Sequence, residues 1–148
     1  MFLRLKNNGQ KMVNAEAVAV SGGLKRGTLV AHDGKKATTD AEAIGIAVRG
    51  EMVDDRVAMG LKADIFANSQ DMIAEGAYFG VEPIYVGEEY ATTEFDGTVA
   101  GETEAKGRLK VTDGKLVKDA GTDGNYQGLG FRTLPGSDKK FLAFRRIK

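Results

Sequence analysis

Hydrophobic residues alternate with polar or small residues in short runs along this chain, and no long run keeps a helical period. The alternation is clear at residues 3–6 and again at 44–49, and a period of two is typical of strands with one buried face. Residues 72–75 fit a single helical turn that ends at Gly76. We expect a half-buried strand at 44–49, a central strand at 141–147, and further strands within 56–67, 84–86 and 90–93.

One short pattern occurs twice. The first copy runs from Lys25 to Lys35 and is closed by residues 45–49, and the second runs from Lys106 to Lys115 and is closed by residues 128–132. The two copies are 80 residues apart at their Asp-Gly pairs, whereas their closing segments are 83 residues apart. An Asp-Gly pair between two β-rich runs indicates a hairpin, because glycine tolerates the positive φ of such a turn.

These patterns predict an all-β fold, a compact β-barrel or β-sandwich built from two related hairpin units, with at most one short helix. Residues 1–23 are expected to form an N-terminal arm and first strand. Residues 24–148 are expected to form a single β domain made of two related halves, about 24–80 and 81–148. The acidic, turn-rich stretch at 94–104 is interpreted as an exposed loop or an irregular hairpin.

Composition narrows the function classes. The chain has 148 residues, 21 basic and 21 acidic side chains and no cysteine, so neither a disulfide nor a thiolate metal site can form. A nucleic-acid binder usually has a basic excess, and none is present here. The N-terminal residues contain no continuous apolar segment of the kind found in signal peptides, and no stretch has the length of a membrane span.

The sequence contains no motif that is typical of an active site. His32, the single histidine, precedes an Asp-Gly turn, and the second copy has Thr112 at that position, so we interpret His32 as a solvent-facing turn residue. Residues 119–125 lack the spacing of a calcium loop, and their Asp and Asn side chains are interpreted as turn formers. We therefore expect that the chain is not an enzyme and that it has no catalytic residue, cofactor or metal.

Two motifs follow each other in the first copy: Gly-x-Leu-Val-x-x-Asp-Gly-Lys at 27–35 and an Ile-Gly-Ile-Ala-Val strand at 44–48. Together they resemble the small cement or decoration proteins of tailed-bacteriophage capsids. A middle segment at 73–76 and a Tyr-Val strand near 84–87 add to this resemblance. The similarity extends from about Val18 to Ile147.

The resemblance implies a virion structural protein, made in the host cytoplasm, that binds the outer surface of an assembled phage capsid and stabilises the head. Its partners would be the major capsid protein and further copies of itself, as a dimer or trimer, with neither nucleic acid nor a membrane involved. The candidate partner-contact residues lie in an N-terminal arm and are Phe2, Leu3, Arg4, Leu5 and Lys6. An ordinary edge strand explains the same residues equally well.

The alternative function is a carbohydrate- or surface-binding β module of a phage fibre or adhesin. Such a module needs exposed aromatic side chains on one face. The candidates are Tyr78, Phe79, Tyr85, Tyr90 and Tyr126.

Overall fold

The computed structural model of this chain describes residues 2–6, 15–18, 22–50, 72–73, 75–76, 78–133 and 139–148. Strands dominate these residues, and the one helix among them is the short α3 (Glu102–Ala105). The strands form several sheets that are compatible with a sandwich and do not close into a barrel, so the all-β prediction is confirmed.

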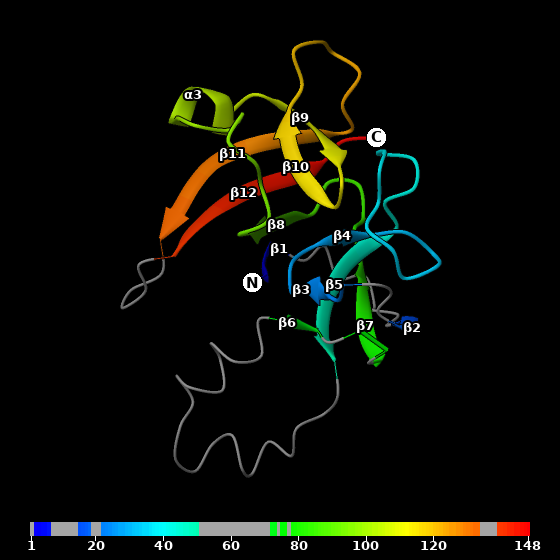
Figure 1. The fold of residues 1–148 in the computed structure, drawn as a ribbon. Helices are drawn as coiled ribbons and strands as arrows, with labels where there is room; N and C mark the ends of the chain where they lie inside the picture. The colour runs from blue at the N-terminus through cyan, green and yellow to red at the C-terminus, as the bar shows by residue number, and fades with distance from the viewer. Residues whose placement is uncertain are drawn as a thin grey trace.

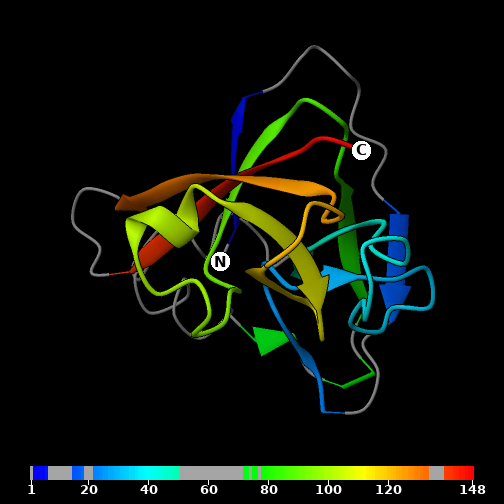
Figure 2. The same ribbon diagram turned by 90° about the horizontal axis from the view of Figure 1, so that it is seen from above.

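The larger sheet has six strands in the order β1-β8-β12-β11-β9-β10 (Figure 1). Every pairing in it is antiparallel. Seen from above, β11 and β12 cross the molecule side by side, with α3 and the β9–β10 hairpin on one side of them (Figure 2). The strands are β1 (Phe2–Lys6), β8 (Glu89–Thr92), β9 (Arg108–Thr112), β10 (Lys115–Lys118), β11 (Tyr126–Thr133) and β12 (Lys140–Arg146).

A second sheet has four strands in the order β2-β7-β5-β4, and a small third sheet pairs β3 with β6. Residues 1–23 therefore contribute to two sheets, since β1 pairs with β8 and β2 pairs with β7. Strand β7 also crosses residue 80, the expected boundary between the halves. The bounds are β2 (Ala15–Val18), β3 (Leu24–Lys25), β4 (Leu29–Val30), β5 (Gly45–Gly50), β6 (Met72–Ile73) and β7 (Tyr78–Pro83).

The second Asp-Gly pair forms the predicted tight hairpin. Thr112 pairs with Lys115, which leaves Asp113 and Gly114 as a two-residue turn between β9 and β10. Both turn residues have positive φ, 48° and 73° respectively, as a type I′ turn requires. This turn follows the right-handed twist of the strands that it joins.

The first Asp-Gly pair also turns the chain, but it does not join two full strands. Gly34 has a φ of 77°, and only a single bridge, between Val30 and Lys36, follows the turn. Strand β4 pairs instead with β5, with Leu29 opposite Ile46. In the second unit Leu109 is opposite Tyr126, so the closing strands correspond in register at a spacing of 80 rather than the 83 that their sequence motifs indicated.

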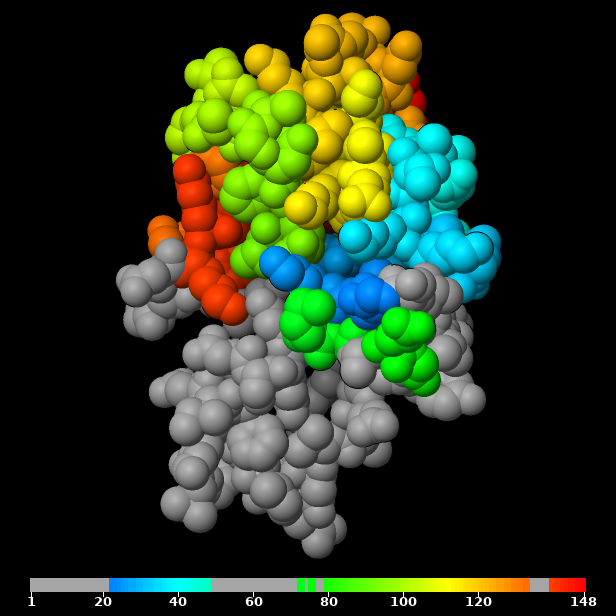
Figure 3. All heavy atoms as spheres, viewed as in Figure 1, coloured from blue at the N-terminus to red at the C-terminus, as the bar shows by residue number. Residues whose placement is uncertain are grey.

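The two units interlock at the second turn. The Leu29 N–H donates to the Gly114 carbonyl at 2.9 Å, and the Gly114 N–H donates to the Ala37 carbonyl at 2.8 Å. The turn of the second unit thus occupies the place where the first hairpin lacks a continuous ladder. Figure 3 shows the cyan first unit directly against the yellow second hairpin.

The main hydrophobic core draws on both units, with Leu29 and Ile46 from the first and Leu109 and Tyr126 from the second. A second core contains Val30 and Ala47, together with residues of β7. Ile46 and Ala47 face different cores and both are fully buried. The prediction of a half-buried strand at 44–49 was therefore wrong for the first part of β5, because layers pack on both of its faces.

Other predicted elements differ in their outcome. The central strand at 141–147 and the strand at 90–93 are confirmed as β12 and β8. The helical turn expected at 72–75 begins instead as strand β6. The strand expected at 84–86 was wrong, because β7 ends at Pro83 and Val86 makes only an isolated bridge to Arg146. The short helix α3 lies within the stretch interpreted as a loop. The strand expected within 56–67 lies outside the described residues.

Candidate functional site

The five candidate partner-contact residues form one element. Phe2, Leu3, Arg4, Leu5 and Lys6 make up β1, which pairs with β8 from Phe2 opposite Thr92 to Lys6 opposite Glu89. A register shift separates Arg4 from Lys6. The structure thus has the edge strand that the sequence allowed, and it is the outermost strand of the six-stranded sheet.

The opposite edge of this sheet is closed by the chain itself. Leu116 of β10 donates its N–H to the Glu94 carbonyl and accepts from the Asp96 N–H, both at 3.1 Å. The Lys118 N–H donates to the Thr98 hydroxyl at 2.9 Å. Residues 94–98 therefore satisfy the outer backbone groups of β10 and prevent another strand from pairing there.

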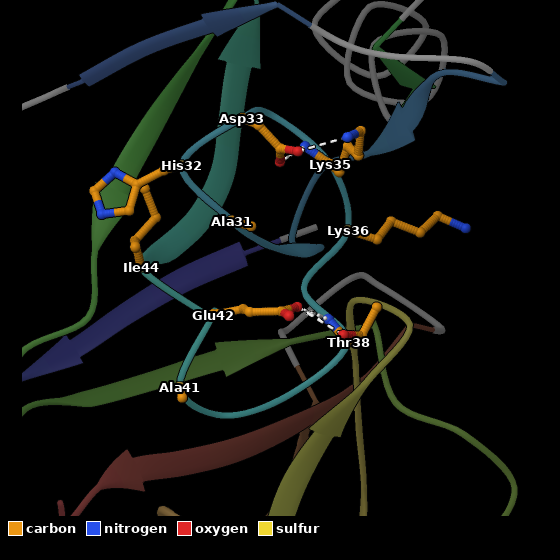
Figure 4. Close-up of a pocket in the computed structure, with 9 residues that line it drawn as sticks. All are labelled: Ala31, His32, Asp33, Lys35, Lys36, Thr38, Ala41, Glu42 and Ile44. Carbon is orange, nitrogen blue, oxygen red and sulfur yellow. Dashed lines mark hydrogen bonds and ion pairs between the residues drawn. The ribbon is translucent and has the colours of Figure 1, made fainter.

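A groove of about 510 Å³ lies inside the loop that joins β4 to β5. Its floor includes Ala31, Ala41 and Ile44, while Glu42 extends across the loop towards Thr38 (Figure 4). The Glu42 carboxylate accepts from the Thr38 hydroxyl at 2.6 Å and from its N–H at 2.9 Å. The hydroxyl bond is the main reason that the pKa of Glu42 is lowered.

His32 lies at the margin of this groove, near Ile44 (Figure 4). Its side chain is exposed, which confirms the interpretation as a solvent-facing turn residue. Beside it the Asp33 carboxylate and the Lys35 ammonium lie 2.7 Å apart, and the hydrogen bond from Lys35 lowers the pKa of Asp33. The groove thus holds a carboxylate and an ammonium that satisfy each other within one turn.

The carboxylate of Asp119 serves its own loop. It accepts from the Gly124 N–H at 2.9 Å and from the Gly121 N–H at 3.3 Å, and these bonds lower its pKa. Lys110 lies 3.8 Å away. The interpretation of Asp119 as a turn former is therefore confirmed. Across the described residues, no group of three or more His, Asp or Glu side chains is arranged to hold a metal ion.

Most of the aromatic candidates for a carbohydrate site belong to the cores. Phe79 is 2% exposed, and Tyr90 and Tyr126 are fully buried. The Tyr90 hydroxyl donates to the buried Glu88 carboxylate at 2.7 Å, and burial raises the pKa of Tyr126 to about 12. Tyr85 keeps an intermediate exposure, and the side chain of Tyr78 lies outside the described part of the structure.

Asp40 is a residue that the sequence patterns did not single out. Its carboxylate accepts hydrogen bonds from the N–H groups of Val111 and Asn125 in the second unit, the latter at 2.7 Å. It fills the place where β9 extends beyond the start of β11. Asp40 therefore connects the two units. No local sequence motif predicts this role, because its partners are 71 and 85 residues away.

Comparisons of the chain with protein-family models, with curated proteins and with solved structures found no match. Within the described residues, no helix combines the length and the apolar character that crossing a membrane requires.

Proposed function

We propose that this chain is a virion structural protein that binds the outer surface of an assembled phage capsid and cements neighbouring major capsid subunits. The observation that carries the proposal is the contrast between the two edges of the six-stranded sheet. The chain closes the β10 edge with residues 94–98, whereas the candidate contact residues lie in β1 at the other edge. An edge strand offers backbone N–H and C=O groups with which a neighbouring chain can pair.

The hydrogen bonds that connect the two units, at the Gly114 turn and at Asp40, form a joint that supports the same proposal. A protein that reinforces a capsid must carry mechanical force between its contact sites without its own halves separating. Here the Gly114 turn is hydrogen-bonded into the first unit, and Asp40 of the first unit is hydrogen-bonded into the second. Binding only to the assembled lattice would stabilise that lattice by mass action, and many identical contacts would act together.

Deleting residues 1–10 tests the proposal. We expect a folded protein, because the strand removed is outermost in its sheet, and we expect it to lose co-sedimentation with assembled capsids. Circular dichroism and thermal unfolding check the fold, and pelleting with capsids of the same phage measures binding. Wild-type pelleting by the deletion variant would contradict the contact through β1.

A variant that keeps the strand gives a second test. R4E/K6E reverses two charges in β1, and we expect it to weaken capsid binding while the thermal transition stays close to that of the wild type. The matched control is K25E/R132E, which makes the same change in charge at two exposed positions elsewhere. Equal loss of binding in both variants would indicate a general charge effect rather than a contact at β1.

The carbohydrate-binding alternative makes a different prediction. It requires aromatic side chains that can stack on sugar rings, and three of its five candidates are buried in the cores. A glycan array with specific hits, together with no saturable capsid binding, would favour the alternative over the capsid proposal.

A further inference from the structure

A row of polar residues crosses four neighbouring strands on the face of the six-stranded sheet opposite the main core, beside the small buried cluster of Ala91 and Ala143. Arg108 pairs with Gln127, Gln127 with Arg145, and Arg145 with Glu89. Residues directly opposite each other in antiparallel strands share a face, so these four side chains project from the same side. The adjacent positions Tyr126 and Phe144 face the main core on the other side (Figure 1 shows the strands).

Two guanidinium groups in this row have a buried donor without an acceptor. Among the described residues, Arg108 Nη1 and Arg145 Nε are both inaccessible to solvent and make no hydrogen bond. Arg145 uses its Nη2 for an ion pair with Glu89, whereas no hydrogen bond or ion pair within the described residues engages the Arg108 side chain. Such groups are rare in folded proteins, because a desolvated donor without an acceptor is unfavourable.

Both arginines nevertheless remain open to a partner. The Arg145 side chain is 40% exposed, and Arg108 has an intermediate exposure. Gln127 lies between them and is held in place by its amide nitrogen, which donates to the Lys106 carbonyl at 2.6 Å. Docking requires that each guanidinium turns its unsatisfied N–H towards an acceptor outside the sheet.

The charge around the row is positive once internal pairs are counted. Glu89 is engaged by Arg145, and the neighbouring Asp119 lies 3.8 Å from Lys110. The Arg108 charge has no counterpart among the described residues. A guanidinium with free N–H groups matches a carboxylate, to which it can donate two parallel hydrogen bonds.

We propose that Arg108, Gln127 and Arg145, the guanidinium row, form a docking surface for an acidic protein segment. Its carboxylates would accept from the two unsatisfied arginine donors on either side of Gln127. We favour a protein segment over a nucleic acid, because nucleic-acid binders usually have a basic excess and this chain has 21 basic and 21 acidic side chains. The row ends at Glu89, which pairs with Lys6 of β1, but the inference does not rest on the capsid proposal.

Titration with a hexaglutamate peptide tests the docking surface on the full chain. With fluorescein-labelled hexaglutamate and anisotropy as the readout, we expect saturable binding. We expect R108Q to weaken it by at least about tenfold, as for the loss of a hydrogen bond to a charged group. The matched control R132Q removes one exposed arginine from the far end of β11 and should bind like the wild type. Amide resonances of residues 108, 127 and 145 should shift during the titration.

Thermal unfolding distinguishes docking from a structural role. R108Q removes a buried guanidinium N–H that has no acceptor, so its melting temperature should equal or exceed that of the wild type. A lower melting temperature with unchanged hexaglutamate affinity would overturn the proposal, as would the absence of hexaglutamate binding by the wild type. A single-stranded oligonucleotide with the same number of charges serves as the comparison. If it binds more tightly than hexaglutamate and its binding depends on Arg108, the proposal of an acidic protein segment is overturned in favour of a nucleic acid.

Discussion

The two Asp-Gly turns have almost the same local sequence and serve different purposes. Gly34 and Gly114 have φ values of 77° and 73°, so the turn glycine has the same left-handed conformation in both copies. Around the first turn the side chains of His32, Asp33 and Lys35 are exposed, and Asp33 is paired to Lys35 two residues later. The second turn is built into its neighbour through hydrogen bonds to Leu29 and Ala37. One motif thus gives an exposed tip in one unit and an internal joint in the other.

The difference follows from the ladder behind each turn. In the second unit β9 and β10 pair over four residues, which makes the hairpin a regular projection that can insert as a unit. In the first unit the ladder is reduced to the bridge between Val30 and Lys36, and the opening beside Leu29 accepts the other turn. A repeat can therefore diverge in function while each copy keeps the residues that its turn requires.

Replacing each turn glycine by alanine should give the largest contrast. A Cβ at Gly114 would lie 2.5 Å from Thr28 Cγ2 and 3.2 Å from the Leu29 carbonyl oxygen, in addition to the strain of a positive φ. We expect G114A to lower the free energy of unfolding by roughly 3 kcal/mol, and G34A by roughly 1–2 kcal/mol from backbone strain. Urea unfolding of both variants measures the difference. Equal losses would mean that the second turn is not a joint.

Removing the carboxylate of Asp40 should have the next largest effect. D40A leaves the N–H groups of Val111 and Asn125 without their acceptor, and we expect a loss of about 2 kcal/mol in the free energy of unfolding. The control is E42A, because Glu42 accepts its hydrogen bonds within its own loop, from the N–H and hydroxyl of Thr38. Hydrogen exchange should accelerate at Val111 and Asn125 in D40A and remain slow in E42A. Protection that is unchanged in D40A would remove Asp40 from the joint.

The smallest effect is expected at the exposed tip. The hydrogen bond from Lys35 lowers the pKa of Asp33 in the folded protein, so this pair stabilises the fold above about pH 4 and its contribution is lost as the pH falls through the lowered pKa. D33N should therefore be only slightly less stable than the wild type at neutral pH, because the pair is exposed, and it should lose less stability in acid. Melting temperatures between pH 2 and pH 7 test this, and a large loss at neutral pH would show that the first turn is also a joint.

Some candidate sites could be predicted from neighbouring residues in the sequence, and others depend on contacts between distant segments. The exposure of His32 followed from its place beside a turn, and the loop role of Asp119 followed from the habit of aspartate to bond nearby N–H groups. Asp40 and the guanidinium row could not be found from the sequence. Each depends on pairings between segments far apart in the chain, and a register shift of one residue would move Arg108 to the other face of the sheet.

The sequence by itself determined the all-β class, the two Asp-Gly turns and the central place of β12. These features depend on residue alternation and on glycine at positive φ, which act over a few neighbouring residues. Only the tertiary structure decided that the closing strands correspond at a spacing of 80, that β5 is buried on both faces, and that one turn is a joint. Those outcomes depend on which layers pack together, and burial is a property of the whole fold rather than of any short pattern.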